Sequence, residues 1–574
     1  MSPPELRSHV RQRLYWGTLA AALLGWGVFA WRVVPALIES AYRRESLPFL
    51  NAIIRGRDVH GVDLYLDAWR PLCWQGLFWC VALWALVPLA RRMARGGFFE
   101  RCVGPATPGT LGAIRALICA ILLMSTLWED LASVSLLPRE FFDFKYIGVL
   151  RGLFLLPIGM EDFLGNWTAL RIFDHLTAAL LFLGMIGLWT RWVVPAGALF
   201  YLVLAGTLRG FTFFWHTGLI PLLVLCLLAF TPCADGFSLD RRLRQRRGLP
   251  VPDADVATPL YGWARYFLWV VIAVPYTAAG LSKLRNGGLM WWHPDNIKSI
   301  VLDDTLSPME FDWGVSLHLV HAPDAAFALL GLAALVTELA FSLVLVSRVA
   351  RLVMPAAMAA THIGILLLQN ILFFDLILIQ AVFYDWRPLR IKAARWLAER
   401  RGLAPSGTAR AGAAAVRFGP MRTAPLPWAL ACLGLGYLLF FSWLNRIEFF
   451  PLTSMKMYSS RKSSGRFDYL KALAIYEDGK KERAYFDHWI KAVADGRYVR
   501  DLYMAFGDEE SRRVIDEFFE ACAREANGTL AEGQRLVAFE IQLWQWKFRA
   551  EPDSPTYGQH LESYVYDVRD VPPG

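Results

Sequence analysis

The sequence predicts an all-α polytopic membrane protein of about eleven transmembrane helices, with a small extramembrane α+β domain at its C-terminal end. Three observations predict this class. Apolar residues make up 56% of the 574 residues, more than is usual in soluble domains. Apolar runs of about 20 residues recur, each long enough to cross roughly 30 Å of hydrocarbon. After residue 447 the pattern changes to short alternating and amphipathic stretches.

The first 105 residues form an N-terminal membrane extension with two predicted helices. The apolar run LYWGTLAAALLGWGVFAW follows RSHVRQR, an arrangement that also occurs in signal peptides. This run is long and lacks a small-residue cleavage site, so we predict an uncleaved helix at 15–38. A second helix at 70–90 ends in the basic cluster RRMARGG.

Nine further membrane spans are predicted. They lie at 110–131, 168–188, 193–209, 211–230, 264–283, 326–347, 350–368, 370–386 and 426–444. Alternate threading of all the spans brings RRMARGG, DRRLRQRRG and the basic segment after 386 to one side, which the positive-inside rule assigns to the cytoplasm. The protein is therefore predicted to be integral to the membrane, with a cytoplasmic N-terminus. The segment 139–165 is interrupted by Pro, Gly and charges, and we expect it at the outer interface.

The remaining boundaries follow changes in composition. Residues 106–390 form the predicted transmembrane core, 391–425 a cytoplasmic linker rich in Ala and Arg, 426–446 the last helix, and 447–574 an extracytoplasmic α+β domain. In this domain, DYLKALAIYEDGKKERAYFD predicts a hairpin, DEESRRVIDEFFEACAREAN a helix, and RLVAFEIQLWQWKF a strand. The segment FFPLTSMKMYSSRKSSGRFDY has two interpretations, a basic rim over a site or the solvated exit from the membrane.

Charge and motifs exclude several classes of protein. The net charge of +9 comes largely from arginines in short loops beside apolar spans, which indicates membrane orientation and not nucleic-acid binding. No Cys/His metal spacing, P-loop, GxGxxG or GxSxG motif is present, so the common zinc, nucleotide and hydrolase classes have no support.

A few ionisable and polar residues interrupt the predicted spans. Because a charge inside the membrane is costly, each such residue is a candidate for function. His216 lies near the outer end of 211–230, and Lys283 closes the next span at the same face. His362, Asn370 and Glu338 lie in or beside later spans. We expect these groups to line one outward-facing cavity.

Structural interpretations compete with this one. Lys283 can snorkel to the headgroups, and His216 can be an interhelical hydrogen-bond partner. Glu338 can pair with a polar neighbour inside the membrane. Trp291 and Trp292 suit an interfacial aromatic belt as well as a pocket lid.

The two runs FFWHTGLIPLLVLCLLAFTPCADGFSLDRR and YTAAGLSKLRNGGLMWW resemble the transmembrane core of the vitamin K-dependent gamma-carboxylase and its bacterial relatives, the HTTM-domain (horizontally transferred transmembrane) family. AIRALICAILLMSTLWEDL and THIGILLLQNILFFDLILIQAVFYDW resemble the opening helix and the closing pair of that core. The resemblance covers about 110–390. It departs where the family has Asn-Asn-His and this chain has Phe214, Trp215 and His216, and where Ser282 replaces a lysine.

The resemblance implies a set of roles. Lys283 corresponds to the base that deprotonates a hydroquinone, either reduced vitamin K or a menaquinol. His216 corresponds to the histidine that stabilises the substrate carbanion, with O2 and CO2 as co-substrates. His362 corresponds to a histidine of a later helix, and we place it with Trp215, Trp291, Trp292, Asn370 and Glu338 among the residues expected to contact the quinone or substrate. The expected function is quinol oxidation coupled to modification of a substrate at the outer face, with lipid, quinone and a protein as partners.

Two other functions remain open. The first is a non-catalytic membrane subunit that presents its C-terminal domain to a partner or binds lipid. The second is a transporter, which the sequence disfavours because no inverted repeat is visible.

Overall fold

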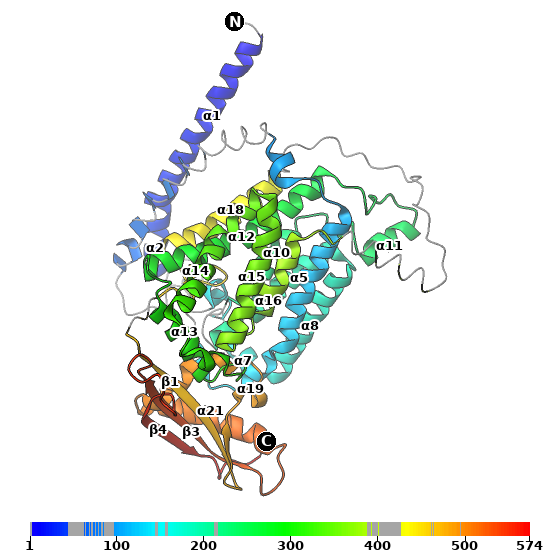
Figure 1. Ribbon diagram of the computed structural model, residues 1–574. Coiled ribbons are helices and arrows are strands. Elements are labelled where there is room, and N and C mark those ends of the chain that lie inside the picture. Colours follow the sequence, from blue (N-terminus) through cyan, green and yellow to red (C-terminus); the bar gives the residue numbers. More distant parts are fainter. Residues whose placement is uncertain are drawn as a thin grey trace. The chain divides into compact units, whose positions relative to one another are not determined.

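The computed structural model describes residues 3–43, 97–143, 147–154, 159–211, 216–386, 426–460, 464–493 and 495–573, with single positions and short pieces at 62–84, 392, 396, 400 and 462. The chain divides into two compact units. The first comprises Met1–Glu100 and Leu150–Asp162, and the second comprises Arg101–Val149 and Phe163–Gly574. Figure 1 labels their elements.

The first unit contains one long N-terminal helix. It runs through α1 (Pro3–Val28), the π-helical turn η1 (Phe29–Val33) and α2 (Val34–Tyr42). Its apolar part, Leu14–Ser40, contains the helix predicted at 15–38. The indole of Trp26 donates to the carbonyl of Cys73, so this helix contacts the helical pieces described between residues 62 and 84. Most of the helix predicted at 70–90 lies outside the described residues.

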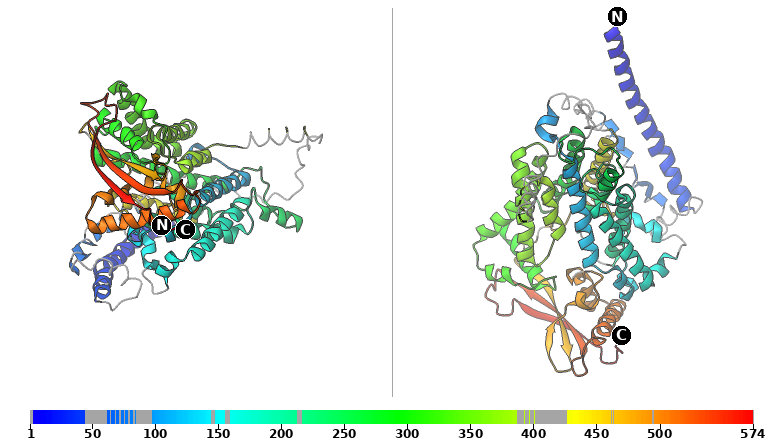
Figure 2. Two further views of the ribbon diagram at one scale, coloured as in Figure 1. Left: turned by 90° about the horizontal axis from the view of Figure 1, so that it is seen from below. Right: turned by 90° about the vertical axis from the view of Figure 1, so that its right-hand side faces the viewer.

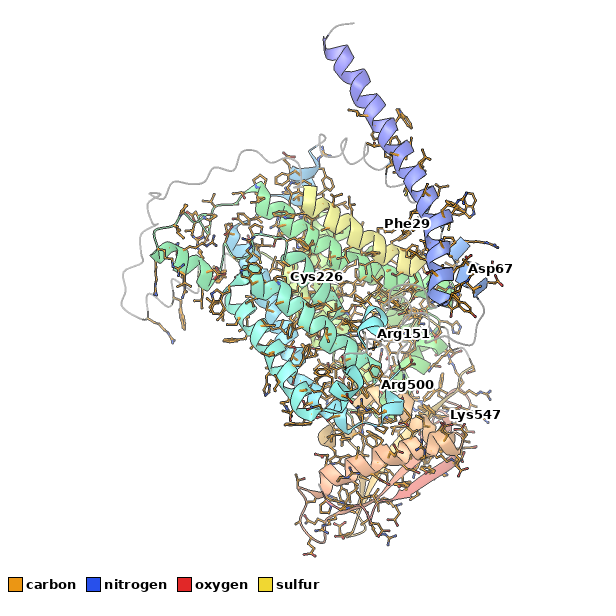
Figure 3. All side chains as sticks on the ribbon, turned by 180° about the vertical axis from the view of Figure 1, so that it is seen from behind. Phe29, Asp67, Arg151, Cys226, Arg500 and Lys547 are labelled. Atoms are coloured by element: carbon orange, nitrogen blue, oxygen red, sulfur yellow. The ribbon has the colours of Figure 1, made fainter. Side chains whose placement is uncertain are left out.

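The second unit is mostly helical. Its longer helical elements are α5 (Pro108–Trp128), α8 (Trp167–Ile186), α9 (Thr190–Gly210), α10 (Leu219–Leu228), α11 (Leu239–Arg246), α12 (Pro259–Gly287), α13 (Pro294–Leu306), α14 (Asp324–Ala340), η7 (Phe341–Leu345), α15 (Arg348–Gln369), α16 (Phe374–Leu378), η8 (Ile379–Phe383) and α18 (Leu426–Leu444). Figure 3 shows how side chains such as Cys226 fill the space among these helices.

Seven helices among the described residues of the whole chain are long and apolar enough to cross a membrane. Three further apolar helices are shorter: Leu219–Leu228, Phe374–Phe383 and Trp428–Leu444. The spans predicted at 211–230 and 370–386 are therefore not continuous long helices among these residues. The segment 139–165 contains only short helical pieces where it is described, in agreement with the sequence.

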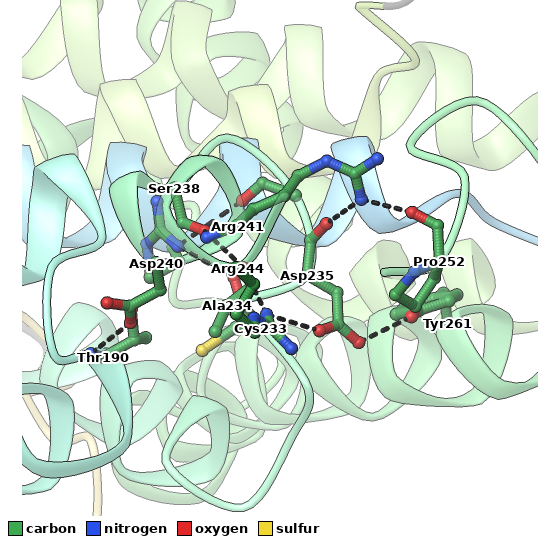
Figure 4. A network of polar contacts seen from close by, with 12 residues as sticks. Thr190, Cys233, Ala234, Asp235, Ser238, Asp240, Arg241, Arg244, Pro252 and Tyr261 are labelled. Atoms are coloured by element: carbon green, nitrogen blue, oxygen red, sulfur yellow. Dashed lines mark hydrogen bonds and ion pairs between the residues drawn. The ribbon is translucent and has the colours of Figure 1, made fainter. Parts of the chain in front are cut away.

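Polar side chains fix one end of the bundle, around α11. Ser238 caps the N-terminus of α11 by accepting a hydrogen bond from the backbone of Arg241 at 3.0 Å. The carboxylate of Asp240 accepts from the amides of Trp189 and Thr190 at 2.8 and 2.7 Å, at the start of α9. Figure 4 shows this network. Ser238 and Asp240 of the Ser-Leu-Asp sequence thus have structural roles, since they cap α11 and connect it to the start of α9.

Buried hydrogen bonds of Arg115 also connect the helices at this end of the bundle. Its side chain is fully buried and donates to the carbonyls of Cys233 and Phe237, between α10 and α11. It also donates to the carbonyl of Met185, near the end of α8. A guanidinium satisfied by backbone carbonyls lets an arginine lie inside an apolar bundle.

The C-terminal domain is an antiparallel sheet covered by one long helix. Its strands β1 (Phe467–Tyr476), β2 (Lys481–Arg483), β3 (Leu536–Trp546) and β4 (Gln559–Asp567) pair in the order β2-β1-β3-β4. The helix α21 (Glu509–Asn527) packs on one face through Phe518 and Phe519. The predicted hairpin, helix and strand are all present, and Figure 2 shows the sheet and α21 from two further sides.

The other face of the sheet meets the bundle. Phe467, Tyr469 and Trp546 pack with Leu302 of α13 and with Val320. A buried ion pair joins Arg497 to Glu129 at the end of α5, with 2.6 Å between Nη1 and Oε1. The domain is thereby fixed to the end of the bundle opposite α11, because α12 starts beside the α11 loop and ends in contact with residues 454–459.

We expect Arg497→Met to loosen the docking of this domain. The substitution leaves the carboxylate of Glu129, whose side chain is 10% exposed, without its guanidinium partner. Trypsin should then cleave faster between residues 447 and 466. Arg513→Met is the matched control, because Arg513 is 61% exposed and pairs with Glu140 at 3.7 Å. Equal cleavage rates for the two variants would contradict the expectation.

Candidate functional site

Lys283 and Glu338 form the central contact of the site. Lys283 lies near the C-terminal end of α12, just before its last turn, and its Nζ is 2.8 Å from both carboxylate oxygens of Glu338 on α14. Lys283 is 7% exposed, and the Glu338 side chain is 15% exposed. Two of the predicted site residues therefore bind each other. An amine and a carboxylate held this close can exchange a proton or share a ligand's hydroxyl group.

Gly280 makes this contact possible. A Cβ atom at position 280 would lie 2.9 Å from the backbone nitrogen of Leu339 and 3.1 Å from the Cβ of Glu338. Since such distances are shorter than real Cβ contacts, only glycine lets α12 approach α14 at this level. The glycine of the AGLSKL sequence thus has a packing role one turn before the lysine.

Trp291 closes the lysine from another side. The Nζ of Lys283 lies 5.2 Å from the centroid of the Trp291 ring, within the range of a cation–π contact. Trp291 is 4% exposed, and its indole donates to the carbonyl of Tyr458 at 2.8 Å. Trp292 is partly buried and packs against the cluster that contains Trp291, Ile297 and Phe327. Of the predicted tryptophan pair, Trp291 therefore contacts the amine.

His216 lies just before α10 and not within a helix. Its Nε2 is 3.1 Å from the hydroxyl of Thr453, and that hydroxyl donates to Glu448 at 2.7 Å. The imidazole is 7% exposed. Trp215, predicted to lie beside it, falls outside the described residues. Thr453 and Glu448 were not predicted, because no local pattern indicates that the chain after the last helix folds back onto His216.

Two buried charged residues hold the turn that follows His216. Arg209 donates to the carbonyl of Thr217, and Asp375 accepts from the amide of Gly218 at 2.7 Å. These two side chains therefore bind the carbonyl and the amide of the same peptide group. Asp375 is completely buried and Arg209 is 3% exposed. The lone acid in the apolar run FFDLIL is the signal that sequence reasoning missed.

His362 is enclosed by aromatic rings. Its ring centroid lies 6.0 Å from that of Tyr276 and 5.9 Å from that of Phe373. His362 is 7% exposed, and neither ring nitrogen has a hydrogen-bond partner among the described residues. Buried polar atoms are rarely left unpaired, so these nitrogens indicate a place for water or for a ligand hydroxyl.

Lys283, His216 and His362 lie in one region of the bundle. Ser282, next to Lys283, donates to Ser454, whose neighbour Thr453 contacts His216, and Tyr276 of the same helix α12 packs against His362. Asn370, also predicted to line the site, instead ends α15 in the left-handed conformation with φ of 59°. Its side chain accepts from the amide of Trp313 at 3.4 Å. Asn370 therefore supports the loop beside the site, while Lys283, Glu338 and Trp291 are in direct contact.

The segment 448–459 covers this end of α12. Ser282 donates to the carbonyl of Ser454 at 2.7 Å, and Asn286 donates to the hydroxyl of Ser459 at 2.8 Å. Thr453 and Ser454 are almost completely buried. This part of the segment therefore packs against α12 and is not solvated, whereas Lys456, Ser460 and Lys462 are exposed.

The described cavities are lined by other residues. One of about 340 Å³ lies between α5 and η8 and is lined by Ile114, Phe237, Val382 and Trp386. A small polar cavity of about 20 Å³ lies next to the His216 turn, lined by Thr217, Glu129, Glu310 and Arg497. It is large enough for about one water molecule.

The described part of the chain is thus a mostly helical structure with seven helices of membrane-spanning length and a small antiparallel sheet. Comparison with known proteins adds nothing to this class, because no family model, curated protein or solved structure matches the chain.

Proposed function

We propose that the chain is an integral membrane enzyme similar to the vitamin K-dependent gamma-carboxylase. It would couple oxidation of a hydroquinone to modification of a substrate at the outer membrane face. The observation that carries this proposal is the Lys283–Glu338 pair, an amine and a carboxylate at 2.8 Å, with Lys283 near the C-terminal end of α12 and Glu338 inside the apolar span Asp324–Leu345. Burying two charges inside an apolar bundle is costly, so a buried ion pair at this position is a candidate for function.

The pair suggests other catalytic roles than those implied by the sequence resemblance, in which Lys283 is the base. In an ammonium–carboxylate pair the carboxylate is the group free to accept a proton. Glu338 would accept the proton of a ligand hydroxyl, and the Lys283 ammonium would stabilise the negative charge left on the ligand oxygen. O2 would oxidise the bound hydroquinone to the quinone epoxide, with one oxygen atom entering the ring and the other leaving as water.

The surrounding residues fit such a ligand. His362 offers two unpaired ring nitrogens in an aromatic environment, which suits a ring that carries hydroxyl groups. The segment 448–459 covers the end of α12, so a lipid-borne ligand would enter sideways between helices. Trp291 covers the amine of Lys283 and this segment covers Ser282, so we expect one of them to move when a ligand enters.

We further propose eleven crossings, with a cytoplasmic N-terminus and an extracytoplasmic C-terminal domain. The basic helix α11 lies at the start of α12, whereas Lys283 lies at its end. The 29 residues of α12 span roughly 44 Å at about 1.5 Å per residue, enough to place the two on opposite sides of a bilayer. The positive-inside rule then puts Lys283 toward the outer face.

A turnover assay tests the function. Purified protein in lipid nanodiscs is supplied with reduced vitamin K or a menaquinol and with O2, and the quinone epoxide is measured by mass spectrometry. We expect epoxide from the wild type and at least a hundredfold less from Lys283→Met and from Glu338→Gln, as for the loss of a proton-transfer group. Absence of epoxide with every quinol would refute the proposal.

Lys298→Met is the matched control for this assay. Lys298 is also a buried lysine, paired with Asp324 at 3.0 Å and 5.0 Å from the centroid of the Phe327 ring. It therefore shares the environment of Lys283 without its place near the two histidines. Equal loss of turnover in both lysine variants would indicate a structural effect only.

The ion pairs of the C-terminal domain favour a second candidate function, a membrane subunit that presents this domain to a partner. Arg497 and Arg549 both bind carboxylates of the bundle, so the domain is held in a fixed orientation. This function predicts that substitutions at Lys283 and Glu338 leave the cellular phenotype intact, whereas deletion of residues 447–574 abolishes it.

A further inference from the structure

Unpaired polar atoms gather in one part of the bundle. Both ring nitrogens of His362 on α15, the Oε1 of Gln380 on η8 and the Oδ1 of Asp375 on α16 have no hydrogen-bond partner among the described residues. The three residues are 7%, 2% and 0% exposed, in that order. Internal water molecules with two to four polar partners satisfy such atoms in proteins. These side chains on three adjoining elements therefore indicate bound water.

Tyr276 of α12 connects these three side chains. Its ring centroid lies 6.0 Å from that of His362, and its hydroxyl accepts from the Nε2 of Gln380 at 2.8 Å. The same hydroxyl lies 3.5 Å from the carbonyl of Leu376, the residue after Asp375. Tyr276 is itself 5% exposed. We call Tyr276, His362, Asp375 and Gln380 the Tyr276 cluster.

One side of the Tyr276 cluster faces the Lys283–Glu338 pair. Tyr276 precedes Lys283 by seven residues, so both lie on the same face of α12, roughly 10 Å apart along its axis. The ring of Tyr276 also lies 4.7 Å from that of Phe341, three residues after Glu338. About three water molecules, each about 2.8 Å from the next, bridge such a distance.

The other side of the Tyr276 cluster reaches the small polar cavity beside the His216 turn. The carboxylate of Asp375 accepts from the amide of Gly218 at 2.7 Å. Phe374 and Thr217, the residues directly before these two, line that cavity. Asp375 therefore lies between the cavity and Tyr276.

Glu310 gives the cavity a group that can exchange protons. It lies in the loop after α13, lines the cavity, and accepts from the amide of Leu372 at 2.9 Å. Burial raises the pKa of Glu310 to about 7, so this carboxyl can gain or lose a proton near neutral pH. The other carboxylate of the cavity, Glu129, is paired with Arg497 at 2.6 Å.

We propose that the Tyr276 cluster holds a chain of internal water molecules that conducts protons from the Lys283–Glu338 pair to Glu310. This inference rests on the proposed function, because the proton conducted is that of the hydroquinone. The hydroquinone hydroxyl would give its proton to Glu338, which passes it to the first water and becomes a carboxylate again. Each water accepts one proton and donates another, and Glu310 takes up the last one and releases it to solvent. Chains of polar and acidic side chains serve as such proton relays in membrane proteins.

Hydroxyl-radical footprinting of the full-length protein in nanodiscs tests for this water and needs no turnover. Radiolysis generates radicals from bound water as well as bulk water, so a buried side chain beside internal water is oxidised. We expect Tyr276 and His362 to be oxidised about tenfold faster than Tyr261 on the same helix. Tyr261 is the matched control, because it is 0% exposed and its hydroxyl donates to Asp235 at 2.8 Å (Figure 4). Equal oxidation of Tyr276 and Tyr261 would overturn the proposal.

Kinetics of epoxide formation test whether the water carries the proton. Asp375→Asn keeps an oxygen for the Gly218 amide but removes the carboxylate. We expect kcat to fall about tenfold with KM unchanged, and the solvent deuterium isotope effect on kcat to rise, since proton transfer then limits the rate. Asp501→Asn should change neither quantity. Asp501 is also buried and has an unpaired carboxylate oxygen among the described residues, but it lies in α20 (Val499–Leu502) of the C-terminal domain.

Gln380→Met is a second interruption of the chain, and it leaves the Gly218 turn untouched. Thermal unfolding shows which variants retain the fold. An unchanged kcat and isotope effect in folded Asp375→Asn and Gln380→Met, or equal changes in Asp501→Asn, would overturn the proposal. A wild type that forms no epoxide with any quinol would refute the proposed function and the proton path with it, whereas the footprint would still show whether the Tyr276 cluster holds water.

Discussion

Lys283→Met is expected to lower the free energy of unfolding by about 3–5 kcal/mol, because it leaves the Glu338 carboxylate largely buried without its counter-ion. Epoxide formation should be lost as well. Loss of both properties does not separate structure from chemistry, so the double variant Lys283→Met/Glu338→Met is decisive. Removing both charges together should restore most of the stability, since apolar side chains can replace a buried ion pair at little cost.

The double variant should nevertheless form no epoxide. Unfolding in mixed micelles, followed by far-UV circular dichroism, measures stability, and the quinol assay measures function. A double variant that regains both stability and turnover would exclude the pair from the chemistry. A single variant as stable as the wild type would show instead that Glu338 finds another partner or takes up a proton.

Gly218→Ala is expected to lower the free energy of unfolding, because it combines a left-handed backbone with a steric clash. Gly218 has φ of 72°, and a Cβ atom there would lie 2.1 Å from the hydroxyl oxygen of Tyr201. The left-handed backbone alone costs about 1–3 kcal/mol for other residues. The clash adds to this cost, because Tyr201 is buried and hydrogen-bonded to Ser125 at 3.1 Å.

Gly248→Ala is the control that separates these two contributions. Gly248 has φ of 68°, and nothing lies within 4 Å of its hypothetical Cβ atom. It should show the backbone cost alone, measured as the shift in thermal unfolding midpoint. Tyr201→Phe should rescue Gly218→Ala only in part, because the ring carbon Cζ remains 3.0 Å from the added atom. Equal shifts at positions 218 and 248 would show that the Tyr201 contact relaxes freely.

Many of the helices could be predicted because the length of each apolar run can be counted directly in the sequence. The runs that became α5, α8, α9, α12, α14 and α15 are all of membrane-spanning length. Within the predicted helix at 211–230, residues 216–218 are not helical, because the chain turns at Gly218, where buried charges bind the backbone. Strand β4 was not predicted because it is largely exposed and lacks an apolar alternation.

The candidate site was predictable where one residue alone breaks an apolar run. Lys283, His216, His362 and Glu338 stand out in this way. The hydrogen-bond partners of the site residues could not be predicted from the neighbouring sequence. Thr453 lies 237 positions from His216, and Ser454 lies 172 positions from Ser282. Such pairings depend on tertiary folding of a polar segment that has no periodic pattern of its own.

The contacts of residues 448–459 also set an order for biosynthesis. Glu338 and Trp291, which contact Lys283, precede the final apolar helix, α18, in the chain, but Thr453 and Ser454 follow it. While the ribosome is still translating the middle of the chain, His216 and Ser282 have no such partners. The contacts around His216 and Ser282 are thus expected to form only after α18 and the polar segment that follows it have been synthesised.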